Sequence, residues 1–311
     1  MFPEMLDLTS QMLMKWQRLG DGAVIDPVDA FTRLTLDTIA LCSFDYRFNS
    51  YYQNEMHPFV TSALDALLES GRRASRTGLE TRMRLWSQQH YDEKIQYCWK
   101  ICDEIVAERK RHPREVNDLL NVMLKASDPD TGEKMSDELV RFEMMTFLLA
   151  GHDTTSGLLC FAFLLMLENP RTLQKAQAEV DEVLGDGAIG VKHASQLPYI
   201  NAVLRETVRL YPTAPAFSRR SLSKDDVFVG DGKYRVRAKD TVVVSLPKMH
   251  RDPEVWGDDA EEFKSERMLD ENFQKLPKNC WKPFGTGERS CIGRAFSWQV
   301  SLVDQSIEGL Y

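Results

Sequence analysis

A ten-residue window near the carboxyl end constrains the fold of this chain more than any other feature. It reads Phe284-Gly-Thr-Gly-Glu-Arg-Ser-Cys-Ile-Gly293 and precedes a predicted helix. Gly285 and Gly287 allow the backbone to turn tightly and to approach a flat ligand closely. Cys291 then lies at the expected start of the helix, where unpaired N–H groups and the positive end of the helix dipole favour thiolate over thiol. The window therefore predicts a loop that presents one reactive cysteine.

The alternative is a glycine-rich turn that contains one buried cysteine. Five residue types are fixed within the window, and average usage of about 5–7% each makes a chance match in a chain of this length roughly a one-in-ten-thousand event. They are Phe284, Gly287, Arg289, Cys291 and Gly293. Thiolate is the form of cysteine that binds iron. The guanidinium of Arg289 suits a carboxylate on a ligand, Phe284 can pack beside the sulfur, and Gly293 keeps the first helical turn clear.

The first two-thirds of the chain has helical patterning. Asp26 before Pro27 is a typical N-cap, and Ser136 is another. Helices are expected over residues 83–111, from Ser136 to about Asn169, from Pro170 onward, and over 197–210. Short β-branched runs then predict strands at Val227–Val229, Tyr234–Val236 and Thr241–Ser245. Residues 247–291 show little periodicity. We expect a mainly α fold with a small antiparallel β region, in one domain over residues 1–311.

The segment Gly151-His-Asp-Thr-Thr-Ser-Gly157 lies in the middle of a predicted helix although its residues are weak helix formers. Their summed penalty relative to alanine is roughly 4–5 kcal/mol, so a loop between two helices is the alternative. The apolar flanks keep one helical phase across the segment, which favours a helix. On that face Ala150 and Gly151 leave room for a broad, flat group. Thr154 points at the same space, although its hydroxyl can also bond the carbonyl four residues earlier.

Glu206 and Arg209 are three residues apart on a predicted helix and therefore share a face. Their neighbours are apolar, so at least one of the two ions is expected to be buried and to need a partner. Elsewhere, Gly185-Asp-Gly-Ala-Ile-Gly190 fits a dinucleotide fingerprint. That fingerprint requires a strand before it and a helix after it, whereas here the glycines follow an amphipathic helix. NAD binding is therefore not expected.

Charge and composition exclude several classes of protein. The 311 residues are 43% hydrophobic and 28% charged with a net charge of −8, so a nucleic-acid partner is not expected. The longest apolar stretch, 157–167, is shorter than the roughly 20 residues of a membrane span, and residues 1–16 do not resemble a signal peptide. Of the six cysteines, Cys98 and Cys102 are interpreted as buried residues and not as metal ligands.

The window around Cys291 matches F-x-x-G-x-R-x-C-x-G, and the chain resembles the cytochromes P-450. The resemblance implies that Cys291 ligates haem iron and that Arg289, Phe284, Gly287 and Gly293 line the haem. Ala150-Gly151-His-Asp153-Thr154-Thr matches the family's A-G-x-D/E-T-T. By resemblance, Ala150 and Gly151 contact haem, while Asp153 and Thr154 deliver protons for cleavage of dioxygen. His152 stays unassigned.

The resemblance also implies a structural cluster of Glu206, Arg209 and Arg267. The third member is the least certain, because Ser265 stands where the family has proline and Met268 where it has phenylalanine. Longer stretches resemble the soluble fatty-acid hydroxylases whose haem domain is fused to an NADPH reductase. These include residues 32–38, 46–49 and 250–257. By comparison with that family, we expect this chain to lack the front sheet region and the closing carboxy-terminal elements.

The leading hypothesis is a haem-dependent monooxygenase that inserts oxygen into a C–H bond of an apolar substrate such as a fatty acid. Electrons would come from a flavin reductase or another donor. FAD, FMN and NADPH would then be cofactors of the reductase and not of this chain. One alternative is a truncated fragment with impaired haem binding. Another is a haem-thiolate isomerase or dehydratase, which needs no electrons, although the Asp153–Thr154 pair counts against it. A cytoplasmic location is expected.

Overall fold

The computed structural model describes residues 1–20, 22–74, 85–185, 187 and 189–308. The chain forms two compact units, residues 1–156 and 157–311, and each is described by itself. The sequence-based expectation of one domain therefore stays a prediction.

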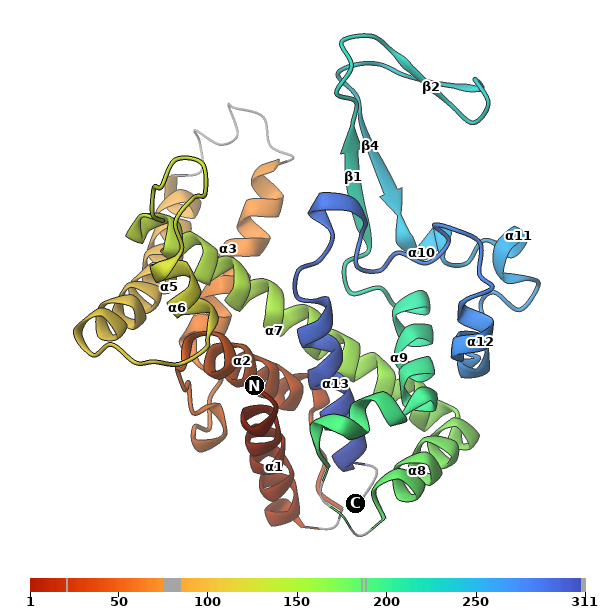
Figure 1. Cartoon of the computed structure of the whole chain (residues 1–311), viewed down its shortest axis with the longest axis horizontal. Coiled ribbons are helices and arrows are strands. Elements are labelled where there is room, and N and C mark those ends of the chain that lie inside the picture. The colour runs from red at the N-terminus through yellow and green to blue at the C-terminus, as the bar shows by residue number, and fades with distance from the viewer. Residues whose placement is uncertain (21, 75–84, 186, 188, 309–311) are drawn as a thin grey trace. The chain divides into compact units, whose positions relative to one another are not determined.

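The first unit is helical in all its regular elements among the described residues (Figure 1). Its elements are α1 (Phe2–Leu19), α2 (Pro27–Phe44), η1 (Ser50–Tyr52), α3 (Pro58–Ala74), α5 (Leu85–Arg111), α6 (Leu119–Lys125) and most of α7 (Asp137–Glu168). The carboxylate of Asp26 accepts the N–H groups of Val28 and Asp29, which confirms the predicted N-cap of α2. The predicted helix over 83–111 is confirmed from Leu85, while Met83 and Arg84 lie outside the described residues.

The core of this unit forms where α1 packs on α2 and α3 packs on α5. Phe31 and Leu34 of α2 and Met12 of α1 are almost fully buried. Burying a large apolar side chain stabilises a fold by about 1.5–3 kcal/mol. Cys98 and Cys102 of α5 are buried as predicted, and burial raises the pKa of the Cys98 thiol to about 11 and that of Cys102 to about 12.

Residues 32–38 carry two buried charged side chains with a structural role. The guanidinium of Arg33 donates to carbonyl oxygens of residues 50–55 at 2.6–3.4 Å. One helical turn later, Asp37 accepts both the N–H (2.9 Å) and the hydroxyl (2.8 Å) of Ser50. Burial raises the pKa of the Asp37 carboxyl, although these two hydrogen bonds oppose the shift. The two residues hold the loop after α2 against that helix.

Helix α7 is continuous through Gly151–Gly157, so the alternative of a loop there is wrong. The hydroxyl of Ser136 accepts the N–H of Leu139 at 3.2 Å, which confirms the predicted cap. Among the described residues, α7 is long and apolar enough to cross a membrane by length and composition, with 44% of its apolar window buried. Core helices of soluble proteins pass the same test. The expected absence of a membrane segment stays a prediction.

The second unit combines helices with two small antiparallel sheets (Figure 1). Its longer helices are α8 (Pro170–Leu184), α9 (Pro198–Leu210) and α13 (Arg294–Glu308), and its short ones are η2 (Val191–Gln196), α10 (Leu246–Met249), α11 (Pro253–Trp256), η3 (Ser265–Met268), α12 (Asp270–Phe273) and η4 (Gly287–Arg289). Helix α8 ends at Gly185, which has a φ of 53°. As predicted, the glycine-rich segment ends a helix, while Asp186 and Ala188 within it lie outside the described residues.

The strands form one hairpin nested within another. Strand β1 (Ala216–Arg220) pairs with β4 (Thr241–Ser245), with Ser218 opposite Val243. Between them, β2 (Val227–Val229) pairs with β3 (Tyr234–Val236). The turn of the inner hairpin contains Gly230, Asp231 and Gly232, all with positive φ. The predicted mainly α fold with a small antiparallel β region is confirmed.

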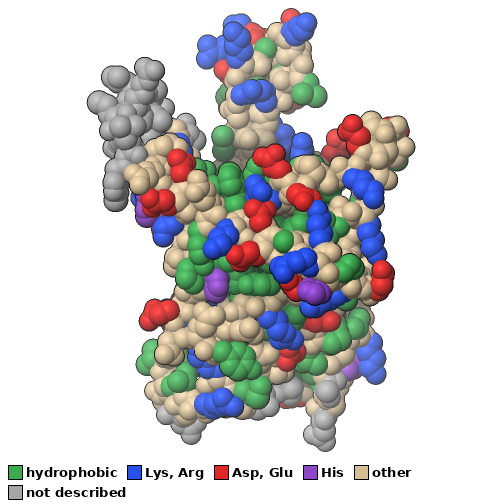
Figure 2. Space-filling view, turned by 90° about the vertical axis from the view of Figure 1, so that its left-hand side faces the viewer, with side chains coloured by type: hydrophobic (Ala, Val, Ile, Leu, Met, Phe, Trp, Pro, Cys, Tyr) green, Lys and Arg blue, Asp and Glu red, His purple; other side chains and the backbone are tan. Residues whose placement is uncertain are grey.

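Charged side chains of both signs are interspersed on the face drawn in Figure 2. On the face drawn in Figure 2, lysine and arginine side chains lie next to aspartate and glutamate side chains and form no broad basic area. This mixture agrees with the net charge of −8. The expected absence of a nucleic-acid partner stays a prediction.

Candidate functional site

The cysteine loop, residues 281–293, is closed by a backbone hydrogen bond. The N–H of Cys291 donates to the carbonyl oxygen of Phe284 at 2.8 Å. Gly285 (φ 70°) and Gly287 (φ 74°) lie in the left-handed region that favours glycine. A Cβ built on Gly287 would meet no heavy atom within 4 Å, so its surroundings are open. The tight turn predicted from the two glycines is confirmed.

The helix after this loop begins later than the sequence analysis expected. Helix α13 starts at Arg294, three residues beyond Cys291, and the carbonyl of Gly293 accepts the N–H of Ser297 at 2.9 Å. Gly293 therefore occupies the cap position, and Cys291 lies outside the first turn. Because dipole effects fall off within one turn, the proposed effect of the helix on the Cys291 thiol is weaker than expected.

Exposure separates Cys291 from the other five cysteines. Cys42, Cys98, Cys102 and Cys280 are buried, Cys160 is half-buried, and Cys291 alone is exposed. Burial raises the pKa of the Cys42 thiol to about 12 and raises that of Cys280 as well. Thiolate is the metal-binding form, so buried thiols of this kind make poor ligands. Cys291 is the cysteine that a ligand in solution can reach.

Three further residues of the predicted site surround Cys291. A Cβ on Gly293 would lie 3.8 Å from the Cys291 sulfur, which is ordinary contact distance. Phe284 is half-buried, with its ring between two tryptophans. Arg289 is exposed and has no acidic partner within the part of the chain that the structure describes. An uncommitted guanidinium is available to a ligand carboxylate.

Because α7 is unbroken, Ala150, Asp153 and Thr154 lie on one side of the helix. Ala150 and Asp153 are exposed, and Thr154 is half-buried. The Thr154 hydroxyl donates to the Ala150 carbonyl at 2.8 Å, the local bond that the sequence analysis named as the alternative. Its lone pairs are left to accept a second hydrogen bond. The predicted catalytic pair thus lies on an accessible helix face.

The side of Gly151 on which a side chain would stand is not open to solvent. A Cβ built on Gly151 would lie 2.9 Å from Cγ1 and 3.0 Å from Cδ1 of Ile39 in α2. The missing side chain therefore lets α2 and α7 approach each other. Helix packing therefore fills the side of Gly151 on which a Cβ would stand, and the expected contact of Gly151 with haem stays a prediction.

His152 was unassigned from the sequence, and the structure buries it completely. Its Nδ1 lies 2.7 Å from the Leu148 carbonyl, and burial lowers the pKa of the imidazole. Its Nε2 has no hydrogen-bond partner among the described residues. The Thr35 hydroxyl donates to the His152 carbonyl at 2.9 Å, which ties α2 to α7. The residue has a packing role in α7.

The predicted cluster of Glu206, Arg209 and Arg267 is confirmed in the second unit. Both carboxylate oxygens of Glu206 accept from Arg209 at 2.8 Å, and Arg267 Nε lies 3.3 Å from Glu206 Oε1. Glu206 and Arg209 have no exposed surface. Arg209 also donates to the carbonyls of His250, Ala260 and Glu262. These bonds bind the irregular segment before the cysteine loop to α9.

The departure from the family pattern at Ser265 leaves a trace in the structure. Its hydroxyl is buried and has no hydrogen-bond partner in the described part of the chain. An unpaired buried hydroxyl destabilises a fold by about 1–3 kcal/mol. Arg267 still reaches Glu206 despite this change.

Sequence reasoning missed His250, which links the cluster to the cysteine loop. Its side chain is fully buried, its Nδ1 lies 3.2 Å from the Arg209 carbonyl, and its Nε2 accepts the N–H of Lys282 at 3.0 Å. Desolvation lowers the pKa of this imidazole to about 4. No local pattern distinguishes it from a surface histidine, because its partners are 41 and 32 residues away.

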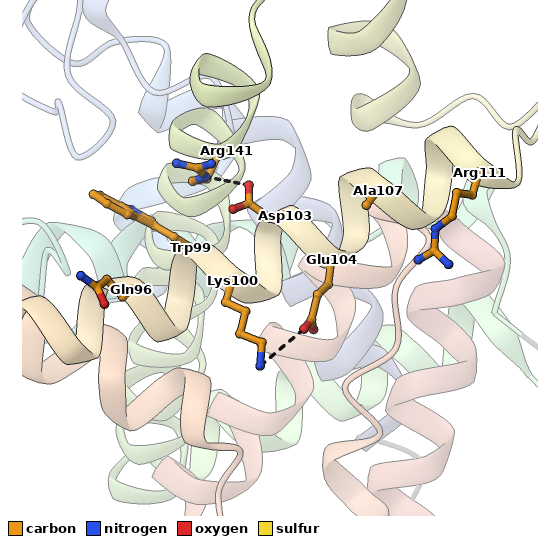
Figure 3. Close-up of a pocket in the computed structure, with 8 residues that line it drawn as sticks. All are labelled: Gln96, Trp99, Lys100, Asp103, Glu104, Ala107, Arg111 and Arg141. Atoms are coloured by element: carbon orange, nitrogen blue, oxygen red, sulfur yellow. Dashed lines mark hydrogen bonds and ion pairs between the residues drawn. The ribbon is translucent and has the colours of Figure 1, made fainter.

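A separate concavity of about 470 Å³ lies on α5 in the first unit (Figure 3). Figure 3 shows Arg141 directed at Asp103 and Lys100 directed at Glu104, at 2.7 Å and 3.8 Å. The half-buried Trp99 forms part of its wall. Because four of its charged groups already pair with each other, this concavity offers little to a charged ligand. It contains none of the predicted site residues.

Comparison with known proteins agrees with the family that the sequence resembles. The family model described as Cytochrome P450 matches residues 1–301. The chain belongs to the cytochrome P450 family. It is 50% identical over 303 residues to a self-sufficient cytochrome P450 monooxygenase of Phanerodontia chrysosporium, covering 97% of this chain and 28% of that protein. It is 49% identical over 309 residues to a bifunctional cytochrome P450/NADPH–P450 reductase of Acremonium egyptiacum, covering 97% of this chain and 29% of that protein.

The chain thus spans less than a third of the length of these curated relatives. Cytochromes P450 carry haem on a cysteine thiolate. The residues of this cytochrome P450 fit that group, because the loop exposes Cys291 and leaves the space beside Gly287 open. Arg289, free of acidic partners among the described residues, suits a propionate.

Proposed function

We propose that this cytochrome P450 is a haem-dependent monooxygenase that inserts one oxygen atom of dioxygen into a C–H bond of an apolar substrate. The other oxygen atom leaves as water, with two electrons from an external donor and two protons. The observation that carries the proposal is the single exposed cysteine, Cys291, on a loop closed by the bond from its own N–H to Phe284. Haem held by the Cys291 thiolate would supply the activation of dioxygen, because a thiolate ligand donates electron density to the iron.

The residues of the chain have distinct roles in this proposal. Cys291 would hold the iron, and Arg289 would bind a propionate, with Phe284, Gly287 and Gly293 lining the group. Asp153 is exposed, so its carboxylate can exchange protons with water. The Thr154 hydroxyl donates its hydrogen to the Ala150 carbonyl, so its oxygen can accept a hydrogen bond from a second group that bears a proton. Asp153 and Thr154 would together hold and move protons for the reaction.

We further propose a fatty acid as the substrate and an NADPH-dependent flavin reductase as the electron donor. The names of the relatives include an NADPH–P450 reductase and a self-sufficient monooxygenase, which supports the electron donor. Support for the fatty acid comes from the resemblance of residues 32–38 and 250–257 to fatty-acid hydroxylases. FAD and FMN would belong to the reductase.

Haem titration of the full chain tests the ligand. One haem per chain should bind, and the reduced, CO-treated protein should show the Soret band of a thiolate ligand. Cys291→Ser should lose that band, whereas the matched control Cys280→Ser, at a buried cysteine in the same unit, should keep it. If Cys291→Ser leaves the spectrum unchanged, the assignment of the ligand is wrong. Failure of the wild-type chain to take up haem would favour the alternative of an impaired fragment.

The reaction is tested by supplying an NADPH-dependent reductase, a fatty acid and ¹⁸O-labelled dioxygen to the haem-loaded chain. A hydroxylated fatty acid carrying one labelled oxygen is expected. An isomerised or dehydrated product formed without a reductant would instead support an isomerase or dehydratase.

A further inference from the structure

Two tryptophans enclose Phe284, and neither belongs to the motif that defines the cysteine loop. The ring of Trp298 meets that of Phe284 at a centroid distance of 5.7 Å and 73°. Trp281 approaches the same ring at 6.3 Å and 60°. Edge-to-face contacts of this kind stabilise beyond the area that they bury. The Phe284 ring thus contacts two larger rings.

Both indoles are attached to neighbouring turns of α9. The Trp298 Nε1–H donates to Asn201 Oδ1 at 2.7 Å, and the Trp281 Nε1–H donates to the Arg205 carbonyl at 3.2 Å. Asn201 and Arg205 are four residues apart and therefore lie on one side of the helix. The Asn201 amide nitrogen donates to the Leu197 carbonyl at 2.8 Å, which determines which end of the amide faces Trp298. A rigid helix thus orients both tryptophans.

The position of Phe284 reaches Cys291 through the backbone. The Phe284 carbonyl accepts the Cys291 N–H at 2.8 Å, so any displacement of Phe284 displaces the residue that bears the sulfur. Outer residues that orient a metal ligand commonly matter almost as much as the ligand itself.

We propose that Trp281 and Trp298, the tryptophan bracket, are positioning residues that hold Phe284 and thereby orient the Cys291 sulfur toward the haem iron. The proposal rests on the proposed function, in which Cys291 is the ligand. In this proposal the bracket positions Cys291 from α9. The hydrogen bond from Trp298 to Asn201 matters as much as the ring contacts, because it orients the Trp298 indole.

The test compares variants of the haem-loaded full chain by the rate of haem loss and by the Soret band of the CO-bound ferrous form. Trp298→Phe keeps an aromatic ring but removes the N–H donor, and Asn201→Ala removes its acceptor. Each should speed haem loss roughly 10-fold and increase the thiol-ligated fraction. The double variant should be no worse than either single one, because both changes break one bond. Asn201→Asp retains an acceptor oxygen and should restore the thiolate band.

Trp99→Phe, at a half-buried tryptophan of α5 in the first unit, is the matched control and should behave as wild type. The bracket is refuted if Trp298→Phe and Asn201→Ala match this control, or if their effects add. Cys291→Ser separates the two proposals. If that variant keeps the thiolate band, the ligand assignment fails. If it loses the band while the bracket variants keep it, only the bracket fails.

Discussion

The Nε2 of His250 accepts the backbone N–H of Lys282 at 3.0 Å, and this bond joins the Glu206–Arg209 cluster to the cysteine loop. The carbonyl of Arg209, 3.2 Å from Nδ1, can only accept a hydrogen bond, so the proton resides on Nδ1. His250 therefore has to be neutral. Protonation would place a hydrogen on Nε2, which could then no longer accept the Lys282 N–H.

Stability should consequently depend on pH through His250. Its pKa falls from 6.5 to about 4 on folding because of desolvation, so between these values the unfolded chain binds more protons. The contribution of neutral His250 to the free energy of unfolding is fully present above pH 6.5 and is lost as the pH falls toward 4. The total loss is about 3 kcal/mol. Urea unfolding at a series of pH values measures it. His250→Gln should flatten the dependence, whereas His112→Gln at an exposed site should not.

Arg209→Lys should lower the free energy of unfolding by about 3–5 kcal/mol, the usual effect of disrupting a buried ion pair. Lysine cannot reproduce the fork that contacts both Glu206 oxygens and three carbonyls. Denaturant unfolding of the two proteins measures the difference. Arg235→Lys is the control, because Arg235 is exposed and pairs with a partly exposed Asp226. The free energy of unfolding should change by less than about 1 kcal/mol. Equal effects of the two substitutions would argue against the structural role of the cluster.

Gly151→Ala should destabilise the protein by about 1–3 kcal/mol, because its Cβ would lie 2.9 Å from Ile39 Cγ1. The effect should be smaller in an Ile39→Ala background, where the space is free, and thermal unfolding of the four proteins gives this coupling. The control Gly71→Ala in α3 meets no atom within 4 Å and should stabilise by about 0.5–1 kcal/mol. An additive result would show that α2 does not restrict Gly151.

Thr154→Ala should lower the amount of hydroxylated product formed per dioxygen consumed several-fold while haem uptake stays unchanged. Thr146→Ala is the matched control, because the hydroxyls of Thr146 and Thr154 both donate to the carbonyl four residues earlier at 2.8 Å. Oxygen consumption and product are measured together with a reductase present. Equal ratios in the two variants would remove Thr154 from proton delivery.

Local patterns predicted much of the secondary structure. The caps at Asp26 and Ser136 and the strands at residues 227–229, 234–236 and 241–245 agree with the structure. Strand β1 was not predicted, because Ala-Phe-Ser-Arg-Arg at 216–220 lacks β-branched alternation and is a strand through its pairing with β4. The start of α13 was placed three residues too early, since Gly293 continues no apolar phase that would mark the boundary.

Sequence alone was enough to predict which residues carry the chemistry of this cytochrome P450, because the spacing of Phe284, Arg289 and Cys291 is a local property of one loop. Tertiary structure decided what supports that loop. His250 bonds it from 32 residues away in the sequence, and Asn201 bonds Trp298, which follows the loop, from 97 residues away. It also decided that the side of Gly151 on which a Cβ would stand packs against Ile39. Helical phase defines a face of α7, but only packing selects the element that covers it.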